Sequence, residues 1–202
     1  MKKGLMIIIS GSSGSGKSTV RKELIKVSND FYYSVSATTR QPRDNEIAGV
    51  DYNYVTQEEF QRLIDKNEFI EYKQYNENSY GSPKKPVIDN LNEGKNVIFE
   101  INVDGALELM KNYPEIISIW ISPPNYESLK KRLYDRATEP AEVIEKRLKI
   151  AKDEIEYLFE YDYLVINEDD KSAETAEKIL NIIACENLKT ERNKDFYENF
   201  YK

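Results

Sequence analysis

The chain has 202 residues, of which 36 are acidic and 29 are basic, so its formal net charge is −7 at pH 7. This length fits one domain, or one core domain with inserted lobes, and a hydrophobic content of 40% is enough to form a buried core. There is no histidine and one cysteine, Cys185, which excludes histidine-based catalytic triads, HExxH metalloproteases, cysteine-built zinc sites and intrachain disulfides. Any chemistry must therefore use carboxylates, Arg and Lys or hydroxyl groups, with or without a hard metal ion.

Neither a membrane nor a nucleic acid is an expected partner. The longest apolar runs, residues 5–9 and 116–121, are too short to cross a bilayer, and no signal peptide is expected. An isoelectric point near 5.0 without a basic stripe disfavours binding to nucleic acid. We therefore expect a cytoplasmic protein with small-molecule substrates, and the sequence does not distinguish a monomer from a homo-oligomer.

The first half of the chain predicts a strand, a turn and helices. Leu5–Ile9 is an apolar run that predicts a buried strand, and a helix is expected from about Ser18. Thr56 begins a capping-box sequence, T-Q-E-E, which predicts the start of another helix. Gly94 suits the C-terminal cap of a helix over Val87–Glu93.

The second half predicts further strands that alternate with helices. Pro140 suits the first turn of a helix whose apolar residues recur at helical spacing as far as Leu158. Residues 191–202 are polar with scattered aromatics, which favours a frayed tail or a short surface helix. Three apolar runs predict strands: Val97–Ile101, Ile116–Ile121 and Tyr163–Ile166. The alternation indicates the α/β class, with a parallel sheet covered on both faces, and residues 34–96 indicate an inserted lobe rich in aromatics.

The strongest functional signal is the glycine-rich segment Gly11–Ser18. Its sequence, GSSGSGKS, matches G-x-x-x-x-G-K-S/T and lies between a predicted strand and a predicted helix. Glycines let backbone N–H groups approach phosphate oxygens, Lys17 would reach the β- and γ-phosphates, and the Ser18 hydroxyl would ligate Mg²⁺. The flanking elements disfavour the alternative of a flexible serine and glycine loop. The segment predicts a nucleoside triphosphate site at Gly11, Ser12, Ser13, Gly14, Ser15, Gly16, Lys17, Ser18 and Thr19.

Phosphoryl transfer to a phosphate acceptor needs positioned positive charge rather than a proton shuttle, so the absence of histidine is no obstacle. An acidic protein must then concentrate arginines where two polyanions meet. Two clusters are candidates, and for each the alternative is a solvated surface charge. The first is Arg40 with Arg43, and the second is Arg132, Arg136 and Arg147, on and between two predicted helices.

Several separated stretches of the chain resemble guanylate kinases. They occur in the family's order over about residues 5–180, which makes the resemblance far more specific than a phosphate loop alone. The stretches are GSSGSGKST at 11–19, SVSATTRQPR at 34–43, GVDYNYV at 49–55, EFIEY at 68–72, SYGSP at 79–83, FEINVDGA at 99–106, KKRL at 130–133, EKRL at 145–148 and EYDYLVINEDD at 160–170.

The resemblance implies a P-loop fold and the reaction ATP + GMP → ADP + GDP with Mg²⁺, with dGMP as a further acceptor. It also implies a three-layer core with two attached parts. The core would comprise about residues 1–36, 93–125 and 151–190, the GMP-binding lobe about 37–92, and the helical lid about 126–150, followed by a polar tail at 191–202.

The resemblance further implies a set of GMP-binding residues. The GMP phosphate would be held at Arg40, Arg43, Tyr52 and Tyr80, and the base would be read at Ser36, Glu71, Ser82 and Asn102. A carboxylate such as Glu71 can accept hydrogen bonds from N1–H and from the 2-amino group of guanine, whereas adenine lacks both donors. The alternatives are a solvent-facing Glu71 and tyrosines that only pack in the lobe core.

The resemblance also implies which residues bind ATP, which hold Mg²⁺ and which contact the transferring phosphoryl group. Lid closure would bring arginines onto the phosphoryl group and exclude water. Asn167 matches an asparagine near adenine, and Ser18 with Glu100 would form the Mg²⁺ side. The implied catalytic residues are Lys17, Arg40, Arg132, Arg136 and Arg147.

Three features depart from the family's pattern. Asn102 replaces the second of two carboxylates, of which Glu100 is the first. Asp104 stands where glutamine is common, and one hypothesis is that it partly restores the lost charge. Asp135 and Ala137 replace lid glycines, and a second hypothesis is that Asp135 pairs with a neighbouring arginine.

Two rival interpretations follow from the same fold. A guanylate-kinase-like binding module without activity should lack the Lys17–Ser18 phosphate grip and the lid arginines, yet both are present. A kinase with another phosphate acceptor should lack the guanine readers, which are also present, although Asn102 favours this alternative. The enzyme that phosphorylates GMP is therefore the preferred interpretation.

Overall fold

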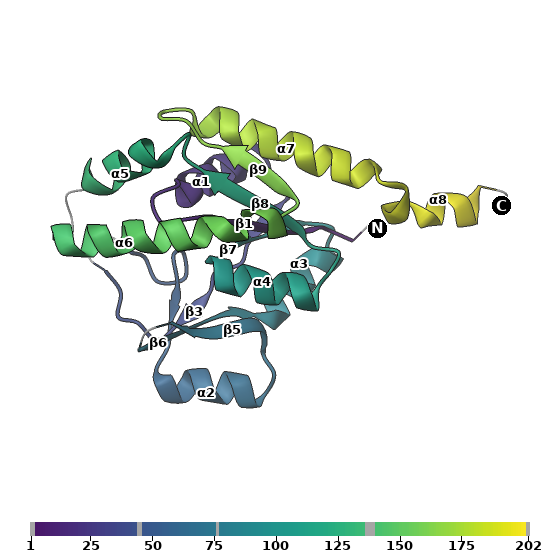
Figure 1. The fold of residues 1–202 in the computed structure, drawn as a ribbon. Helices are drawn as coiled ribbons and strands as arrows, with labels where there is room; N and C mark the ends of the chain where they lie inside the picture. Colours follow the sequence, from purple (N-terminus) through teal and green to yellow (C-terminus); the bar gives the residue numbers. More distant parts are fainter. Residues whose placement is uncertain (1–2, 44–45, 76, 136–139, 201–202) are drawn as a thin grey trace.

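The computed structural model describes residues 3–43, 46–75, 77–135 and 140–200. At its centre lies a five-stranded sheet in the order β2-β7-β1-β8-β9, in which every pair of neighbouring strands is parallel (Figure 1). The predicted α/β class with a parallel sheet is confirmed. The strands are β1 (Met6–Ser10), β2 (Phe31–Tyr33), β7 (Asn96–Glu100), β8 (Ile117–Ser122) and β9 (Tyr163–Ile166).

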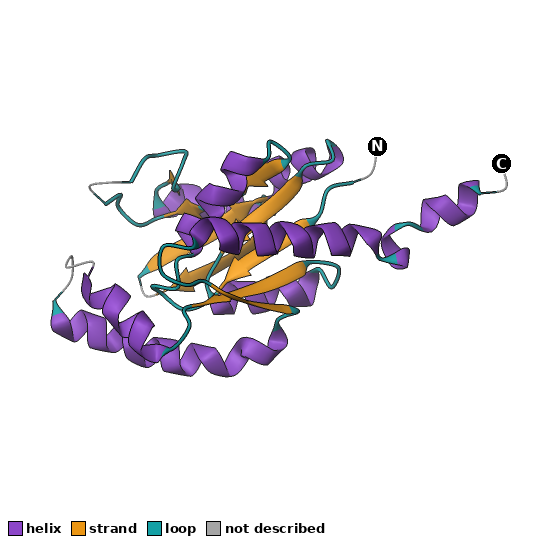
Figure 2. Ribbon diagram, turned by 90° about the horizontal axis from the view of Figure 1, so that it is seen from above, coloured by secondary structure: helices purple, strands orange, loops and turns teal. Residues whose placement is uncertain are grey.

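Both faces of this sheet are buried, because side chains alternate between the faces along each strand. Ile7 and Ile9 of β1 belong to the hydrophobic core on one face, and Ile8 belongs to the core on the other. Figure 2 shows the long helix α7 laid across the strands. The first face is covered by α1 (Lys17–Val27) and α7 (Ser172–Leu188), and the second by α3 (Lys84–Asn92) and α4 (Val103–Asn112).

The strand predictions are confirmed to within one residue at each end, and Tyr163–Ile166 matches without change. The capping box at the start of α2 (Gln57–Asp65) is also confirmed. Thr56 Oγ1 accepts a hydrogen bond from Glu59 N at 3.1 Å, and Glu59 Oε2 accepts one from Thr56 N at 2.8 Å. Gly94, just beyond α3, has a φ of +85°, as its predicted cap position requires.

A second, smaller sheet of four strands has the order β4-β3-β6-β5. Strands β3 and β4 are parallel, and the other two pairs are antiparallel. Helix α2 packs on this sheet by stacking Phe60 on Phe69, with ring centroids 4.6 Å apart. The strands are β3 (Ala37–Thr38), β4 (Asn53–Tyr54), β5 (Phe69–Tyr75) and β6 (Asn78–Pro83).

Helices α5 (Tyr126–Asp135) and α6 (Ala141–Glu154) pack together through Leu129, Leu133, Ile144 and Leu148. The helix predicted to reach Leu158 is too long, because α6 ends at Glu154 and tightens into a 3₁₀ helix, η1 (Ile155–Glu160). Tightening of this kind is common at the end of an α-helix, where carbonyl groups lack partners. Pro140 is also displaced from its predicted place in the first turn: it is the N-cap residue, with a ψ of 150°.

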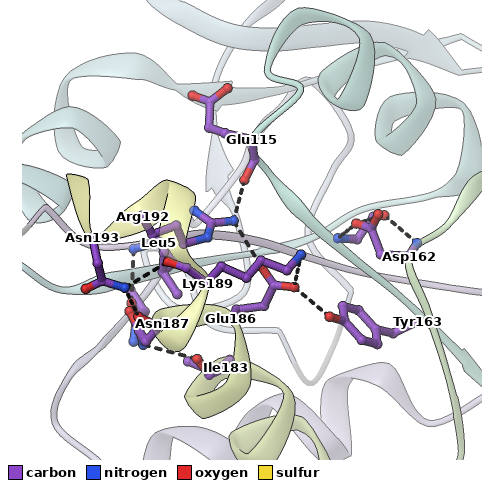
Figure 3. Close-up of polar contacts among 12 residues, drawn as sticks. Leu5, Glu115, Asp162, Tyr163, Ile183, Glu186, Asn187, Lys189, Arg192 and Asn193 are labelled. Atoms are coloured by element: carbon purple, nitrogen blue, oxygen red, sulfur yellow. Dashed lines mark hydrogen bonds and ion pairs between the residues drawn. The ribbon is translucent and has the colours of Figure 1, made fainter. Parts of the chain in front are cut away.

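The C-terminal segment is anchored by one buried carboxylate (Figure 3). Glu186 of α7 accepts a hydrogen bond from the Tyr163 hydroxyl at 2.5 Å and pairs with Lys189 at 2.6 Å and with Arg192 at 3.2 Å. Arg192 lies in the short 3₁₀ helix η2 (Thr190–Arg192), which leads to α8 (Lys194–Asn199), an exposed surface helix that projects from the body (Figure 1). In the described part of the chain no helix has the length and hydrophobicity needed to cross a membrane.

Candidate functional site

The phosphate loop connects β1 to α1 at the carboxyl end of the central sheet. Gly11 and Gly16 have φ values of 133° and 92°, and neither position has room for a side chain. A Cβ atom at Gly11 would lie 2.2 Å from the Ile121 carbonyl oxygen, and one at Gly16 would lie 2.3 Å from Asn167 Nδ2. These close approaches explain why the loop needs glycine at both positions.

Two side chains at the start of α1 face the carboxyl ends of the strands. Lys17 Nζ donates hydrogen bonds to the carbonyl oxygens of Gly11 at 2.6 Å and Ser12 at 3.0 Å, so it lies along the loop. Ser18 Oγ donates to Glu100 Oε1 at 2.5 Å. Glu100 ends β7, the strand beside β1, and parallel neighbours deliver their last residues to the same edge.

The donor set beside the loop fits Mg²⁺. The Ser18 hydroxyl and the Glu100 carboxylate are adjacent oxygen donors, which is the ligand type that Mg²⁺ prefers. Among the described residues, no group of three acidic, histidine or cysteine side chains could hold a metal alone. Mg²⁺ at this position would therefore take its remaining ligands from nucleotide phosphates and water, as is usual for this ion.

A cavity of about 430 Å³ extends from the phosphate loop to the four-stranded sheet. The sequence-predicted residues that line it come from the phosphate loop, the start of α1, strands of both sheets, the segments between strands, and α6. They are Gly11, Ser13, Lys17, Ser36, Arg43, Tyr52, Glu71, Tyr80, Glu100, Asn102 and Arg147. The structure thus brings together the predicted phosphate loop and most of the predicted acceptor residues in one continuous space.

At one end of the cavity Glu71 is buried, with 6% of its surface exposed, so the alternative of a solvent-facing side chain is wrong. Its Oε1 accepts a hydrogen bond from Ser82 Oγ at 2.6 Å. Burial raises the pKa of the Glu71 carboxyl to about 7, although the hydrogen bond from Ser82 opposes the rise. Because Ser82 lies opposite Glu71 in the β5–β6 ladder, the pair is set by strand register.

Near the two cavity tyrosines, Glu46 organises the arginines of the first predicted cluster. Glu46 accepts from Arg40 Nη2 at 2.8 Å, from Arg43 N at 2.9 Å and from the Tyr54 hydroxyl at 2.8 Å. Burial by itself would raise the pKa of Glu46, but these donors lower it to about 2. The Arg40 guanidinium also lies 5.2 Å from the centre of the Tyr52 ring, so it contacts the wall of the cavity.

The second arginine cluster holds the phosphate loop from the α5–α6 side. Arg132 Nη1 donates to the Ser15 carbonyl at 3.2 Å, while its other nitrogens bind Asp169 at 2.7 Å and the Asn167 carbonyl at 2.7 Å. Arg147 Nη2 donates to Ser13 Oγ. Arg136 and Ala137 lie outside the described residues, so the predicted placement of Arg136 one turn from Arg132 cannot be compared.

A second hollow, of about 490 Å³, lies on the other side of the loop and includes Gly16, Arg132 and Asn167 in its wall. The Asn167 amide is buried and uses both ends within the protein. Its Nδ2 donates to the Ser15 carbonyl at 2.9 Å, and its Oδ1 accepts from Thr175 Oγ1 at 3.0 Å. Asp135 also lines this hollow, and within the described ranges it forms no ion pair, since Arg132 binds Asp169 instead.

The two departures on α4 have separate partners. Asn102 is the N-cap of α4, and its Oδ1 accepts from Gly105 N at 3.0 Å. Asp104 pairs with Lys73 Nζ at 3.3 Å, and the two side chains are 53% and 39% exposed. The charge of Asp104 is therefore partly neutralised at the rim by a lysine that itself lines the cavity.

Four charged residues near the site were missed in the sequence: Arg21, Glu46, Lys73 and Glu154. Arg21 carried a usable signal, because it stands beside Val20 and three residues before Leu24 on the face of α1 that is expected to be buried. The other three carried none: Lys73 has a partner from a distant segment, and the partners of Glu46, although within 8 residues along the chain, follow no helix or strand periodicity. Glu154 lines the cavity near Lys17, and burial raises the pKa of its carboxyl.

Comparison with known proteins gives consistent matches over most of the chain. The family model described as guanylate kinase matches residues 3–184. A guanylate kinase of Clostridium tetani is 48% identical over 195 residues, covering 96% of this chain and 92% of that protein. A guanylate kinase of Caldanaerobacter subterraneus subsp. tengcongensis is 45% identical over 196 residues, covering 97% and 94%. The crystal structure of guanylate kinase from Anaplasma phagocytophilum is similar with a TM-score of 0.78 and 33% identity, covering 98% and 96% of the two chains.

Proposed function

The chain belongs to the guanylate kinase family and is a kinase that transfers the γ-phosphoryl group of ATP to GMP, and we propose the residues that perform each part of this reaction. Its products are ADP and GDP. The observation that carries the proposal is the single cavity in which a phosphate loop faces a buried carboxylate. Because both substrates are soluble nucleotides of the cell interior, the proposed location is the cytoplasm.

ATP binds along the phosphate loop in this proposal. Backbone N–H groups of residues 11–16 bind phosphate oxygens, and Lys17 leaves or shares its contacts with the loop carbonyls to reach the β- and γ-phosphates. Mg²⁺, when bound beside Ser18 and Glu100, neutralises charge that develops on the phosphates. Both ends of the Asn167 amide have protein partners. Asn167 therefore supports the loop on the adenine side and does not bind adenine through a free amide.

GMP binds in the part of the cavity that faces the four-stranded sheet. Arg43, Tyr52 and Tyr80 hold its phosphate, together with Arg40. Glu71 accepts from N1–H and the 2-amino group of guanine. The remaining readers of the base are Ser36, Ser82 and Asn102.

The transferring phosphoryl group is held by positive charge from two sides. Helices α5 and α6 act as the lid, and Arg132 and Arg147 exchange their contacts with the loop for contacts with phosphate oxygens. The role proposed for Arg136 rests on the sequence alone. Closure excludes water, which favours transfer to GMP over hydrolysis of ATP.

The rate of ADP formation from ATP and Mg²⁺ tests this proposal, with GMP, dGMP, IMP, AMP, CMP and UMP supplied separately. We expect fast turnover with GMP and dGMP only. IMP lacks only the 2-amino group of guanine, so its rate isolates that one contact. Equal rates for GMP and AMP would contradict the role of Glu71, and ATP binding without turnover of any acceptor would favour the inactive binding module.

A further inference from the structure

Arg21 is a buried cation on helix α1 that has no role in the proposed reaction as described above. It is 5% exposed and lies beside Val20 and near Leu24, which belong to the hydrophobic core. Removing a guanidinium from water is unfavourable unless a partner compensates its charge. The side chain must therefore be explained by what it contacts.

Arg21 is held from two sides by neighbouring strands of the central sheet. Its Nε lies 2.9 Å from Glu100 Oε2 of β7, in an ion pair whose side chains are 7% and 14% exposed. Its guanidinium lies 3.8 Å from the centre of the Tyr33 ring, on the adjacent strand β2. A cation over a ring face is attracted electrostatically, most strongly where water is excluded.

The two oxygens of Glu100 therefore have different partners. Oε2 faces Arg21, while Oε1 accepts the hydrogen bond from Ser18 Oγ at 2.5 Å. Ser18 and Arg21 are three residues apart on α1, a spacing that puts them on the same side of the helix. One carboxylate thus bridges two positions of one helix, and this contact fixes which oxygen is presented to the phosphate loop.

From this arrangement we infer that Arg21 is a positioning residue for the metal-side carboxylate. It occupies Oε2 of Glu100 and thereby leaves Oε1, next to the Ser18 hydroxyl, as the oxygen that faces Mg²⁺ in the nucleotide complex. The inference rests on the proposed metal-side role of Ser18 and Glu100. Replacing a residue that orients a metal ligand from behind typically costs about 10- to 100-fold in metal affinity.

A purely structural tie between α1 and β7 is the competing explanation, and the metal dependence of nucleotide binding separates the two. The experiment uses isothermal titration calorimetry of the full chain with a non-hydrolysable ATP analogue, once with Mg²⁺ and once with EDTA. The ratio of the two dissociation constants measures what the metal contributes. We expect Arg21→Met to reduce this ratio by about tenfold, with EDTA-condition binding unchanged within about twofold.

Lys22→Met is the matched control, because it removes the same charge from the next residue of α1, which is exposed. The ratio for this variant should equal that of the wild type. In kinetics, Arg21→Met should raise the Mg²⁺ concentration for half-maximal rate and leave KM for GMP unchanged. An unchanged ratio, or equal weakening with and without metal, would overturn the inference.

Two further variants keep every outcome interpretable. If circular dichroism shows that Arg21→Met does not fold, Arg21→Lys keeps the charge but loses the planar group, and its ratio should fall by about threefold. An unchanged ratio in Arg21→Lys would then overturn the inference. Glu100→Gln tests the premise: a wild-type ratio in this variant, or a ratio near one in the wild type, contradicts the proposed metal side itself.

Discussion

Glu46 and Glu71 are the same side chain in two surroundings, and their pKa values move in opposite directions. Hydrogen bonds from Arg40, Tyr54 and the Arg43 backbone overcome the effect of burial at Glu46 and lower its pKa to about 2. At Glu71 burial dominates, with Ser82 as a hydroxyl partner, and the pKa rises to about 7. The protein supplies enough donors to stabilise the charged form of Glu46, but it does not do so for Glu71.

This difference indicates that the phosphate end and the base end of the proposed GMP lobe are built in different ways. Glu46 already holds the Arg40 guanidinium and the Arg43 backbone, so part of the phosphate end of the site is built before any substrate arrives. Glu71 can accept several more hydrogen bonds than it receives, and guanine carries two donors on one edge. The base end is therefore completed by the ligand, which is how a buried polar group becomes selective.

Glu71→Gln is the change that should affect this comparison most, because an amide accepts at one atom only and donates at the other. We expect kcat/KM for GMP to fall by about 100- to 1,000-fold, with KM for ATP unchanged within about twofold. Steady-state kinetics of ADP release measure both parameters. Glu68→Gln, at an exposed position of the same sheet region, is the control. A loss below about tenfold in Glu71→Gln would show that Glu71 is not the main reader of guanine.

The same variant should be more stable than the wild type at high pH, because it removes a charge that burial disfavours. The folded-state pKa of about 7 exceeds the ordinary 4.5, so the folded state binds more protons and loses stability as pH rises between these values. We expect Glu71→Gln to raise the free energy of unfolding by up to about 3 kcal/mol at pH 8. Near pH 4.5 the gain should vanish. Urea unfolding measures both, and a loss of stability at pH 8 would contradict the account.

Glu46→Gln should have the opposite sign. The folded-state pKa of about 2 lies below 4.5, so the stabilisation by Glu46 is present above pH 4.5 and is lost as pH falls toward 2. At pH 7 we expect the variant to lose about 1–2 kcal/mol of unfolding free energy and to raise KM for GMP by about tenfold. Glu58→Gln, an exposed carboxylate on α2, is the control for both measurements. A stabilised variant would show that the two glutamates do not differ as described.

Asp104→Gln should have the smallest effect, because its partner Lys73 and Asp104 itself are 39% and 53% exposed. Exposed ion pairs contribute about 0–1 kcal/mol, so we expect kcat/KM for GMP to stay within about twofold. Steady-state kinetics of this variant show whether a rim carboxylate takes part in reading the base. A tenfold loss would support the hypothesis that Asp104 restores the charge that Asn102 lacks.

The sequence predicted what depends on neighbours in the chain. Strand ends, the capping box at Thr56 and the glycine loop follow local rules of hydrophobic pattern and backbone geometry, and they are confirmed. The helix that ends at Glu154 was predicted to continue to Leu158, because the apolar spacing continues into the 3₁₀ segment that follows.

The sequence could not predict which charges pair. The resemblance implied that Arg132 binds the transferring phosphoryl group, but nothing in the sequence indicated its contacts with Ser15 and Asp169, which are 117 and 37 residues away along the chain. Arg21 has the same character, since its partners Glu100 and Tyr33 come from two strands of the central sheet. The partners of Arg132 and Arg21 come together only once the central sheet and its connecting loops are assembled, and no local pattern of residues encodes that assembly.

The charged form of the Glu71 carboxyl lacks compensating donors until guanine binds, which is why its pKa is raised in the free protein. The most direct measurement is a pH titration of the Glu71 side-chain carboxyl by ¹³C NMR, assigned by its absence from the spectrum of Glu71→Gln, in the free protein and with saturating GMP. We expect a pKa of about 7 in the free protein and a value below 4.5 in the complex. A value near 4.5 in the free protein, or no change on adding GMP, would contradict the claim.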